Sequence, residues 1–363
     1  MEILEQGQYG EYLAFLEEQG AHFMQTPFWA GVKPGWGHDI LVLREAGKIR
    51  AGVLLLRRKI SGAHFCMLYA PRGPVCPENR LEEFLGEIIQ YARKRRAYCL
   101  KIDPYVSAEN AEYGARLCGM GFLQLPAGEM GNTQPKFVYQ VDIAGKDPAQ
   151  ILQGFTPKAR YNTRVAERRG VRVTQGGSER AGEFYRLLVE TGRRDGFAVR
   201  QEAYYHNLLE QMGSHAQLFL AELEGAPIAG AIAIWFGKRV WYLYGASSQE
   251  HREAMPNYLM QYRMMLWAAE NGCEVYDMRG ISGDFSEDNP LYGLYRFKKG
   301  FGGRAEELSG EYELAVNSCV YALYRAAMAV RRRYKKKVLE RFKRGGQGEA
   351  AKEGKKERTP KLH

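Results

Sequence analysis

The chain repeats one order of secondary-structure elements in its two halves. Apolar and turn patterns predict strand, strand, helix and strand over 49–56, 67–71, 81–96 and 98–103, and again over 227–234, 240–245, 257–271 and 274–277. The spacing is nearly the same: Tyr69 precedes Asp103 by 34 residues, and Tyr244 precedes Asp277 by 33. Chance similarity of two mixed α/β halves is the alternative.

Each half continues with a helix that ends near Gly119 or Gly300, followed by a closing strand over 138–143 or 310–314. Antiparallel strands followed by a helix and another strand make up an acetyltransferase-like unit. The repeat therefore predicts an α/β (α+β) chain with two tandem GNAT-like (acyl-CoA N-acyltransferase-like) domains. We place these domains at 1–145 and 146–315, expect a helix over 316–344 to complete the first, and expect a disordered tail over 345–363.

The positive charge is concentrated at the C-terminus. Of the 52 Lys/Arg and 42 Asp/Glu residues, 15 and 4 lie in 325–363, giving +11 there, and 37 and 38 lie in 1–324, giving −1. A length of 363 residues suits two domains, and 12% aromatic residues argue against disorder over most of the chain. The basic tail is therefore a separable electrostatic module.

The cysteines and the apolar runs favour a cytoplasmic protein. Six cysteines lie far apart without a Cys-x-x-Cys pair, and the acidic start Met-Glu-Ile-Leu-Glu-Gln is not a signal peptide. Apolar runs such as 53–56 are much shorter than the roughly 20 residues of a membrane-spanning helix. We expect a monomer that is soluble or peripherally bound at the inner face of the plasma membrane.

Two separated motifs carry a family resemblance. The first runs through Tyr-Leu-Tyr244-Gly-Ala-Ser-Ser, Tyr276-Asp-Met-Arg-Gly-Ile and Leu294-Tyr-Arg-Phe-Lys-Lys-Gly-Phe-Gly-Gly; the second is Thr156-Pro-Lys-Ala-Arg-Tyr-Asn-Thr-Arg-Val-Ala-Glu-Arg-Arg-Gly-Val. In order and spacing the chain resembles the Fem-type (FemABX) peptidyltransferases over about residues 20 to 325. The resemblance implies transfer of an amino acid from aminoacyl-tRNA to the stem peptide of a peptidoglycan precursor, as in interpeptide bridge formation.

A long coiled-coil arm, which many Fem-type enzymes carry in the second domain, is not expected in this chain. The stretch 201–220 leaves no room for it, and no heptad run of three or more repeats occurs. The resemblance therefore implies the compact subtype that lacks the arm.

Joining an amine to an activated ester requires a positioned neutral amine and a cation or donors for the oxyanion. It requires no nucleophilic side chain, metal or cofactor. The sequence contains neither His-x-x-His nor Gly-x-Ser-x-Gly, which argues against a metalloenzyme or a serine hydrolase. The resemblance assigns the acyl-transfer lysine to Lys298, since it follows the aromatic residue, rather than to Lys299. Simple capping of a helix C-terminus before Gly300 is the alternative.

The resemblance also implies a set of acceptor-binding residues. A lysine and an arginine suit the phosphates of a precursor, and a carboxylate at a strand end suits the acceptor ammonium. The alternatives are solvated surface cations and a turn cap before Pro104. The positions that match as binding residues are Lys33, Tyr98, Arg200, Tyr204 and Tyr244, and the carboxylate is Asp103, which we count with Lys298 as catalytic.

A cluster of cations lies in the second motif. Arg160, Arg164 and Arg168 are spaced at i, i+4 and i+8 and would form one stripe on a helix, with Lys158 close by. The resemblance implies contact with tRNA or with precursor phosphates, and an ordinary solvated helix face is the alternative. The basic helix expected over 324–345 suits either tRNA or an anionic membrane surface.

Two rival functions remain at this point. The string Arg116-Leu-Cys-Gly-Met-Gly fits the phosphate loop of acyl-CoA N-acetyltransferases, but it follows a predicted helix instead of opening one. A non-enzymatic tRNA- or RNA-binding protein would explain the tail and leave the repeat unexplained. The sequence does not decide which amino acid is transferred, its position in the bridge, or whether the acceptor is lipid II or UDP-MurNAc-pentapeptide.

Overall fold

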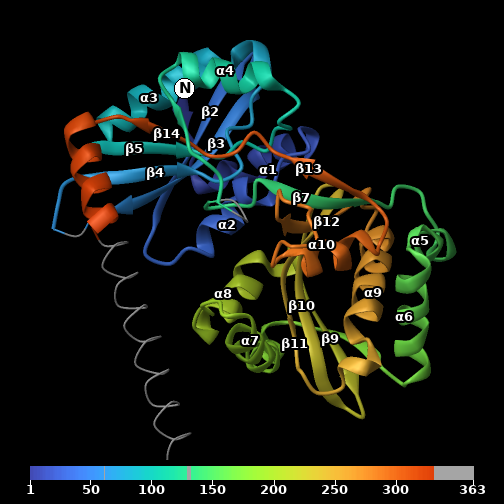
Figure 1. Cartoon of the computed structure of the whole chain (residues 1–363). Helices are drawn as coiled ribbons and strands as arrows, with labels where there is room; N and C mark the ends of the chain where they lie inside the picture. The colour runs from blue at the N-terminus through green and yellow to red at the C-terminus, as the bar shows by residue number, and fades with distance from the viewer. Residues whose placement is uncertain (61, 129–131, 331–363) are drawn as a thin grey trace, which may run out of the picture.

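A computed structural model describes residues 1–60, 62–128 and 132–330 of the chain. Two seven-stranded sheets dominate this part, and Figure 1 shows the sheet with β2–β5 above the sheet with β9–β12. The tail and the helix expected beyond residue 330 lie outside the described residues. No helix in the described part has the length and apolar character needed to cross a membrane.

The first sheet is antiparallel except for one pair, β4 with β5, which runs parallel. Its strands, in spatial order, are β1 (Glu2–Ile3), β2 (Gly37–Glu45), β3 (Lys48–Lys59), β4 (Cys66–Ala70), β5 (Ala97–Ile102), β14 (Tyr312–Ala315) and β6 (Leu123–Gln124). Helices α3 (Leu81–Lys94) and α4 (Ala111–Gly119) share one core with this sheet. Helices α1 (Tyr9–Glu18) and α2 (Pro27–Gly31) contribute to a different core.

The second sheet has one parallel pair as well, β11 with β12. Its strands, in spatial order, are β13 (Arg304–Glu307), β7 (Phe137–Asp142), β12 (Val275–Ile281), β11 (Arg239–Ser247), β10 (Ala226–Phe236), β9 (Ala216–Leu223) and β8 (Arg172–Gly176). The helices of this half are α5 (Pro148–Gly154), α6 (Pro157–Arg168), α7 (Ala181–Asp195), α8 (Glu202–Met212), α9 (Pro256–Glu270) and α10 (Tyr292–Lys299). Short 3-10 turns occur at Gln6–Gln8, Phe23–Gln25, Glu78–Arg80, Ser178–Arg180, Gly213–His215 and Arg252–Ala254.

The two halves share a hydrophobic core. Tyr12 of α1 and Trp29 of α2 are buried in the same cluster as Phe184 of α7 and Tyr205 of α8. Large buried aromatic side chains dominate the energetics of such contacts. The sheets are therefore fixed against each other by packing, and side chains from both can meet between them.

The strand and helix order predicted from the repeat is confirmed, and one assignment is wrong. We expected each half to close its own sheet, whereas the structure exchanges the two closing strands. β7, from the end of the first half, pairs with β12 and β13 of the second sheet. β14, from the end of the second half, pairs with β5 and β6 of the first sheet.

Side-chain fit explains this exchange. Tyr139 and Val141 of β7 are buried in the core of the second sheet, whereas Tyr312 of β14 is buried in the core of the first. Gly303 permits the close approach of the following strand, β13, to β7. A Cβ on Gly303 would lie 2.3 Å from the carbonyl oxygen of Gln140, so only glycine fits at this position. The chain then crosses to the first sheet, where Ser309 N bonds the carbonyl oxygen of Val106 at 2.8 Å.

The second domain has no coiled-coil arm among the described residues. α7 and α8 are joined by the short segment 196–201, and both bury apolar faces in the core shared by the two halves. Gly196 ends α7 in the left-handed conformation with φ 74°, which turns the chain back toward the sheet.

Candidate active site

Four residues that sequence comparison assigned to acceptor binding come together around one tyrosine ring. The Lys33 Nζ lies 5.5 Å from the Tyr204 ring centroid, and the Arg200 guanidinium carbon lies 4.7 Å from it. The Tyr204 and Tyr244 hydroxyl oxygens are 3.1 Å apart. The Lys33 Nζ also lies 4.2 Å from the Trp29 ring centroid. The four predicted residues, which come from the turn after α2, the α7–α8 segment, α8 and β11, form one cluster.

The electrostatics of this cluster favour an anion. Within the described part of the chain, no carboxylate oxygen lies within 4.0 Å of Lys33 or Arg200. Burial, and then the nearby Arg200, lowers the pKa of Lys33 to about 8. Two cations that repel each other and lack a carboxylate gain most from an anionic ligand, because the ligand relieves the repulsion.

Lys298 is almost completely buried at the C-terminal end of α10, with 4% of its surface exposed. Its ammonium donates hydrogen bonds to the carbonyl oxygens of Met278 at 2.7 Å and Gly280 at 2.6 Å. Burial lowers the pKa of Lys298 to about 7, although Asp277 favours the charged form. An ammonium has three donors, so one remains for a substrate oxygen. By contrast, the adjacent Lys299 is exposed and contacts the Tyr295 ring at 5.7 Å.

An irregularity in β12 presents these two carbonyls to Lys298. The register of β12 against β7 shifts between Asp277 and Gly280, and Arg279 has a positive φ of 63°. The Arg279 N–H donates to the Asp277 carboxylate at 2.7 Å, which stabilises this conformation. β12 also pairs with its parallel neighbour only as far as Trp241 opposite Asp277. β11 and β12 therefore separate at the residues of β12 that bind Lys298.

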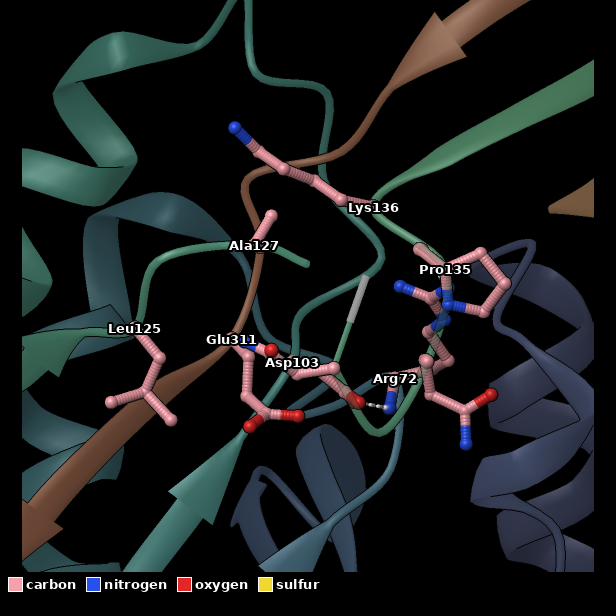
Figure 2. A pocket seen from close by; sticks show the side chains of 10 residues that line it. Arg72, Asp103, Leu125, Ala127, Pro135, Lys136 and Glu311 are labelled. Carbon is pink, nitrogen blue, oxygen red and sulfur yellow. Dashed lines mark hydrogen bonds between the residues drawn. The ribbon is translucent and has the colours of Figure 1, made fainter. Parts of the chain in front are cut away.

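Asp103 is buried directly after β5, with both carboxylate oxygens already bonded. The Tyr69 hydroxyl donates to one oxygen at 2.6 Å and the Arg72 N–H to the other at 2.5 Å. Burial raises the pKa of Asp103 to about 6, against the opposing effect of Arg72. Figure 2 shows the Arg72 contact at the edge of a cavity lined also by Glu311 and Lys136. The volume is about 10 Å³, room for one water-sized group.

A wider cavity of about 490 Å³ shares Ala127 with this small one. It is lined by the loop between β12 and α10, including Ser282 and Asp284, and by Phe137 of β7. Ser282 lies two residues beyond Gly280, whose carbonyl binds Lys298. The loop that lines the larger cavity is therefore continuous with the end of β12 whose carbonyls bind Lys298.

Tyr105, which the sequence analysis did not single out, links the two halves of the site. Its hydroxyl donates to Asp277 at 3.2 Å and accepts from Gln140 at 3.1 Å and Arg239 at 3.0 Å. Its ring centroid lies 5.9 Å from the Arg72 guanidinium carbon. The internal repeat offered one signal for this network, because Asp277 occupies the place in the second half that Asp103 has in the first.

Tyr98 does not lie with the other predicted residues. It is buried at the beginning of β5, about 16 Å along the strand from Asp103. Its ring lies 4.8 Å from that of Tyr324, and its carbonyl oxygen accepts from the N–H of Val316. The expected contact of Tyr98 with the substrate cleft is therefore not supported by its position, because the C-terminal segment covers it.

The predicted cation stripe on α6 differs from the observed one. The Arg160 guanidinium points back to α5 and donates to the carbonyl oxygens of Gln153 at 2.6 Å and Phe155 at 2.9 Å. Lys158, Arg164 and Arg168 are exposed. The i, i+4, i+8 stripe is wrong at its first member, because Arg160 satisfies carbonyls that the end of α5 leaves without partners.

The structure does not support a phosphate-binding loop of the acyl-CoA N-acetyltransferase type at Arg116 to Gly121. Arg116 to Gly119 form the last turns of α4, and β6 begins at Leu123. The Arg116 guanidinium forms an ion pair with Glu82. The backbone N–H groups of this string therefore do not converge at a helix N-terminus as a pyrophosphate would need.

Comparison with known proteins agrees with this geometry. A model of the FemAB family matches residues 8–226 and 224–329. The chain belongs to the FemAB family. Among the relatives of this FemAB member, a lipid II:glycine glycyltransferase of Staphylococcus haemolyticus (strain JCSC1435) is 27% identical over 389 aligned positions, covering 86% of this chain and 93% of the relative. One of Staphylococcus aureus (strain MRSA252) is 26% identical and covers 92% and 98%.

Solved structures show the same architecture. A crystal structure of FemX superposes on the FemAB chain with a TM-score of 0.81 at 26% identity, covering 89% of this chain and 99% of that one. A tandem GNAT protein from the clavulanic acid biosynthesis pathway superposes with a TM-score of 0.52 at 15% identity, covering 87% and 98%. The predicted pair of GNAT-like domains is confirmed.

Proposed function

We propose that this FemAB protein transfers an amino acid from aminoacyl-tRNA to the stem peptide of a peptidoglycan precursor. The observation that carries the proposal is the pair of cations, Lys33 and Arg200, which have no carboxylate partner among the described residues, in the same molecule as a buried lysine that keeps a free donor. The relatives named lipid II:glycine glycyltransferases support a precursor as acceptor and an amino acid as the transferred group.

Each part of the site has a role in this reaction. The precursor phosphates bind Lys33 and Arg200 through charge-assisted hydrogen bonds. The Tyr204 ring holds both cations, and the Tyr244 hydroxyl, bonded to that of Tyr204, orients the ring. Asp103 orients the acceptor ammonium from the small cavity, which holds a group of that size.

The chemical step then needs little more than positioning. The acceptor nitrogen, after losing a proton, attacks the ester carbonyl carbon, and the Lys298 ammonium donates to the oxyanion that forms. The carbon–oxygen bond to the ribose breaks, an amide remains, and the ribose oxygen takes a proton. The acceptor ammonium loses two protons in total: the ribose oxygen takes one and the other is released to solvent, so atoms and charge balance.

The direct test is turnover. Purified protein is incubated with a mixture of charged tRNAs and with either lipid II or UDP-MurNAc-pentapeptide, and the products are read by mass. We expect one amino acid to be added to one of the acceptors, and RNase treatment of the tRNA to abolish the addition. Acylation from acetyl-CoA with no use of charged tRNA would contradict the proposal.

The pH dependence of kcat reports the protonation state of Lys298. With both substrates saturating, kcat is expected to fall as pH rises through about 7, because the protonated fraction drops from about one half at pH 7 to about one tenth at pH 8. This descending limb should persist in Lys299→Met and be absent from the residual activity of Lys298→Met. A limb that instead rises through pH 7 and depends on Lys298 would mean that the neutral amine acts as a base.

A further inference from the structure

Helix α6 begins beside the proposed acyl-transfer centre. The N–H of its N-cap residue, Thr156, donates to the carbonyl oxygen of Gly300 at 2.9 Å, and the Thr156 hydroxyl donates to the same oxygen at 3.2 Å. Gly300 follows Lys298 by two residues. The inner face of α6, with Ala159, Asn162, Thr163 and Ala166, is buried against the second domain. The outer face therefore starts near the lysine and leads away from it.

Cations and one aromatic ring occupy this outer face. Lys158, Tyr161, Arg164 and Arg168 point to solvent, and 61% of the Tyr161 surface is exposed. The Arg168 guanidinium carbon lies 5.8 Å from the Tyr161 ring centroid. On an α-helix these four positions fall within an arc of about 120°. We call them the α6 face.

The α6 face carries uncompensated positive charge. In the part of the chain that the structure describes, no carboxylate oxygen lies within 4.0 Å of its three cations. The neighbouring charges are paired elsewhere: Glu167 with Arg263 at 3.5 Å, and Arg169 with Glu253 at 3.9 Å. The face therefore attracts an anion and offers a ring on which a planar group can stack.

Single-stranded nucleic acid has this combination of charge and planar groups. Phosphates bind lysine and arginine, and an unpaired base stacks on an exposed aromatic ring without regard to its sequence. Lys158 and Arg168 are about 15 Å apart along the helix, the rise of about four stacked nucleotides. The 3′ end of a tRNA is a short unpaired segment that ends in the ester, and this end must come close to Lys298.

We propose that the α6 face binds the unpaired 3′ segment of the RNA donor. Tyr161 stacks on a base, Arg164 and Arg168 contact phosphates, and the Lys158 end of the face lies toward the ester. This inference rests on the proposed function for one point, that the ester end of the RNA lies toward Lys158. The binding of an unpaired RNA end can be measured without turnover.

Binding of two RNA minihelices to the full chain separates stacking from general attraction. One minihelix has a four-nucleotide 3′ overhang and the other is blunt, and fluorescence anisotropy gives Kd for each at several salt concentrations. Wild type is expected to prefer the overhang. Tyr161→Ala should weaken overhang binding about fivefold to 150-fold and leave blunt binding unchanged, because one stacked base is lost. Tyr161→Phe should keep the affinity, and Tyr161→Leu should lose it.

Variants of the α6 cations are expected to change the salt dependence of RNA binding, unlike the Tyr161 variants. Arg164→Gln and Arg168→Gln should weaken binding of both minihelices and each reduce the slope of log Kd against log salt by about 0.7 to 0.9. Arg169→Gln, a neighbour that pairs with Glu253, is the matched control and should leave the slope unchanged. Affinity for UDP-MurNAc-pentapeptide should be the same in every variant.

Three results would overturn the inference. The first is equal wild-type affinity for overhang and blunt minihelices, and the second is overhang binding by Tyr161→Ala within about twofold of wild type. The third is an effect of Tyr161→Ala on binding to anionic phosphatidylglycerol vesicles and not on RNA. If charged tRNA still supports turnover in any of these cases, the α6 assignment fails alone; without turnover from charged tRNA, the proposed function fails as well.

Discussion

Replacing Lys298 with methionine is expected to lower kcat by about 10² to 10³, which corresponds to about 2.7 to 4 kcal/mol of transition-state stabilisation. The reason is its geometry: two of the three ammonium donors are held by the carbonyls of Met278 and Gly280, so the third is fixed in direction before the oxyanion forms. Acceptor affinity should change little, because the oxyanion exists only in the transition state. Single-turnover rates at saturating acceptor measure the effect.

The neighbouring lysine is the matched control. Lys299 belongs to the same helical turn but is exposed, so Lys299→Met should keep kcat within about threefold of wild type. Lys298→Gln tests the charge itself, because an amide can still donate to a carbonyl and so helps the fold to persist. Thermal unfolding checks all three variants. Wild-type kcat in a folded Lys298→Met, or loss of activity in Lys299→Met alone, would show the assignment to be wrong.

Removing either cation of the acceptor cluster should raise the acceptor KM by about 10-fold to 150-fold, the equivalent of about 1.5 to 3 kcal/mol for a charged hydrogen bond. Lys33→Ala and Arg200→Ala each remove one phosphate contact. The KM for aminoacyl-tRNA and the kcat should change much less. Because burial and Arg200 lower the pKa of Lys33 to about 8, the acceptor KM of wild type should also rise as pH increases above about 8.

Stability measurements distinguish binding from folding in these variants. Lys33 and Arg200 both contact the Tyr204 ring and repel each other, so removing one should leave the unfolding temperature of the free protein unchanged or raise it. Lys238→Ala removes an exposed lysine that pairs with Glu274 and is the control for loss of charge. If acceptor KM in Lys33→Ala and Arg200→Ala stays at the wild-type value, the precursor phosphates bind elsewhere.

Sequence motifs predicted much of the candidate site. The motif around Phe297-Lys298 marked the buried lysine, and the matches at Lys33, Arg200, Tyr204 and Tyr244 marked residues that lie in one cluster. These residues could be found because each lies in a continuous motif. Tyr105 could not, since its three hydrogen-bond partners come from β7, β11 and β12. A residue whose partners are distant in the chain leaves no local pattern.

The order of strands and helices was determined by the sequence alone, because the hydrophobic period and the turn residues that define each element lie within a few positions of one another. The tertiary structure decided which sheet each closing strand joins. β7 and β14 are both short strands with buried tyrosines, and only the cores that Tyr139 and Tyr312 enter distinguish them. It also decided the direction of individual side chains: Arg160 turns to the end of α5, and Tyr98 packs against Tyr324. Strand pairing and side-chain packing depend on the free energy of contacts between segments far apart in the chain, which no local pattern contains.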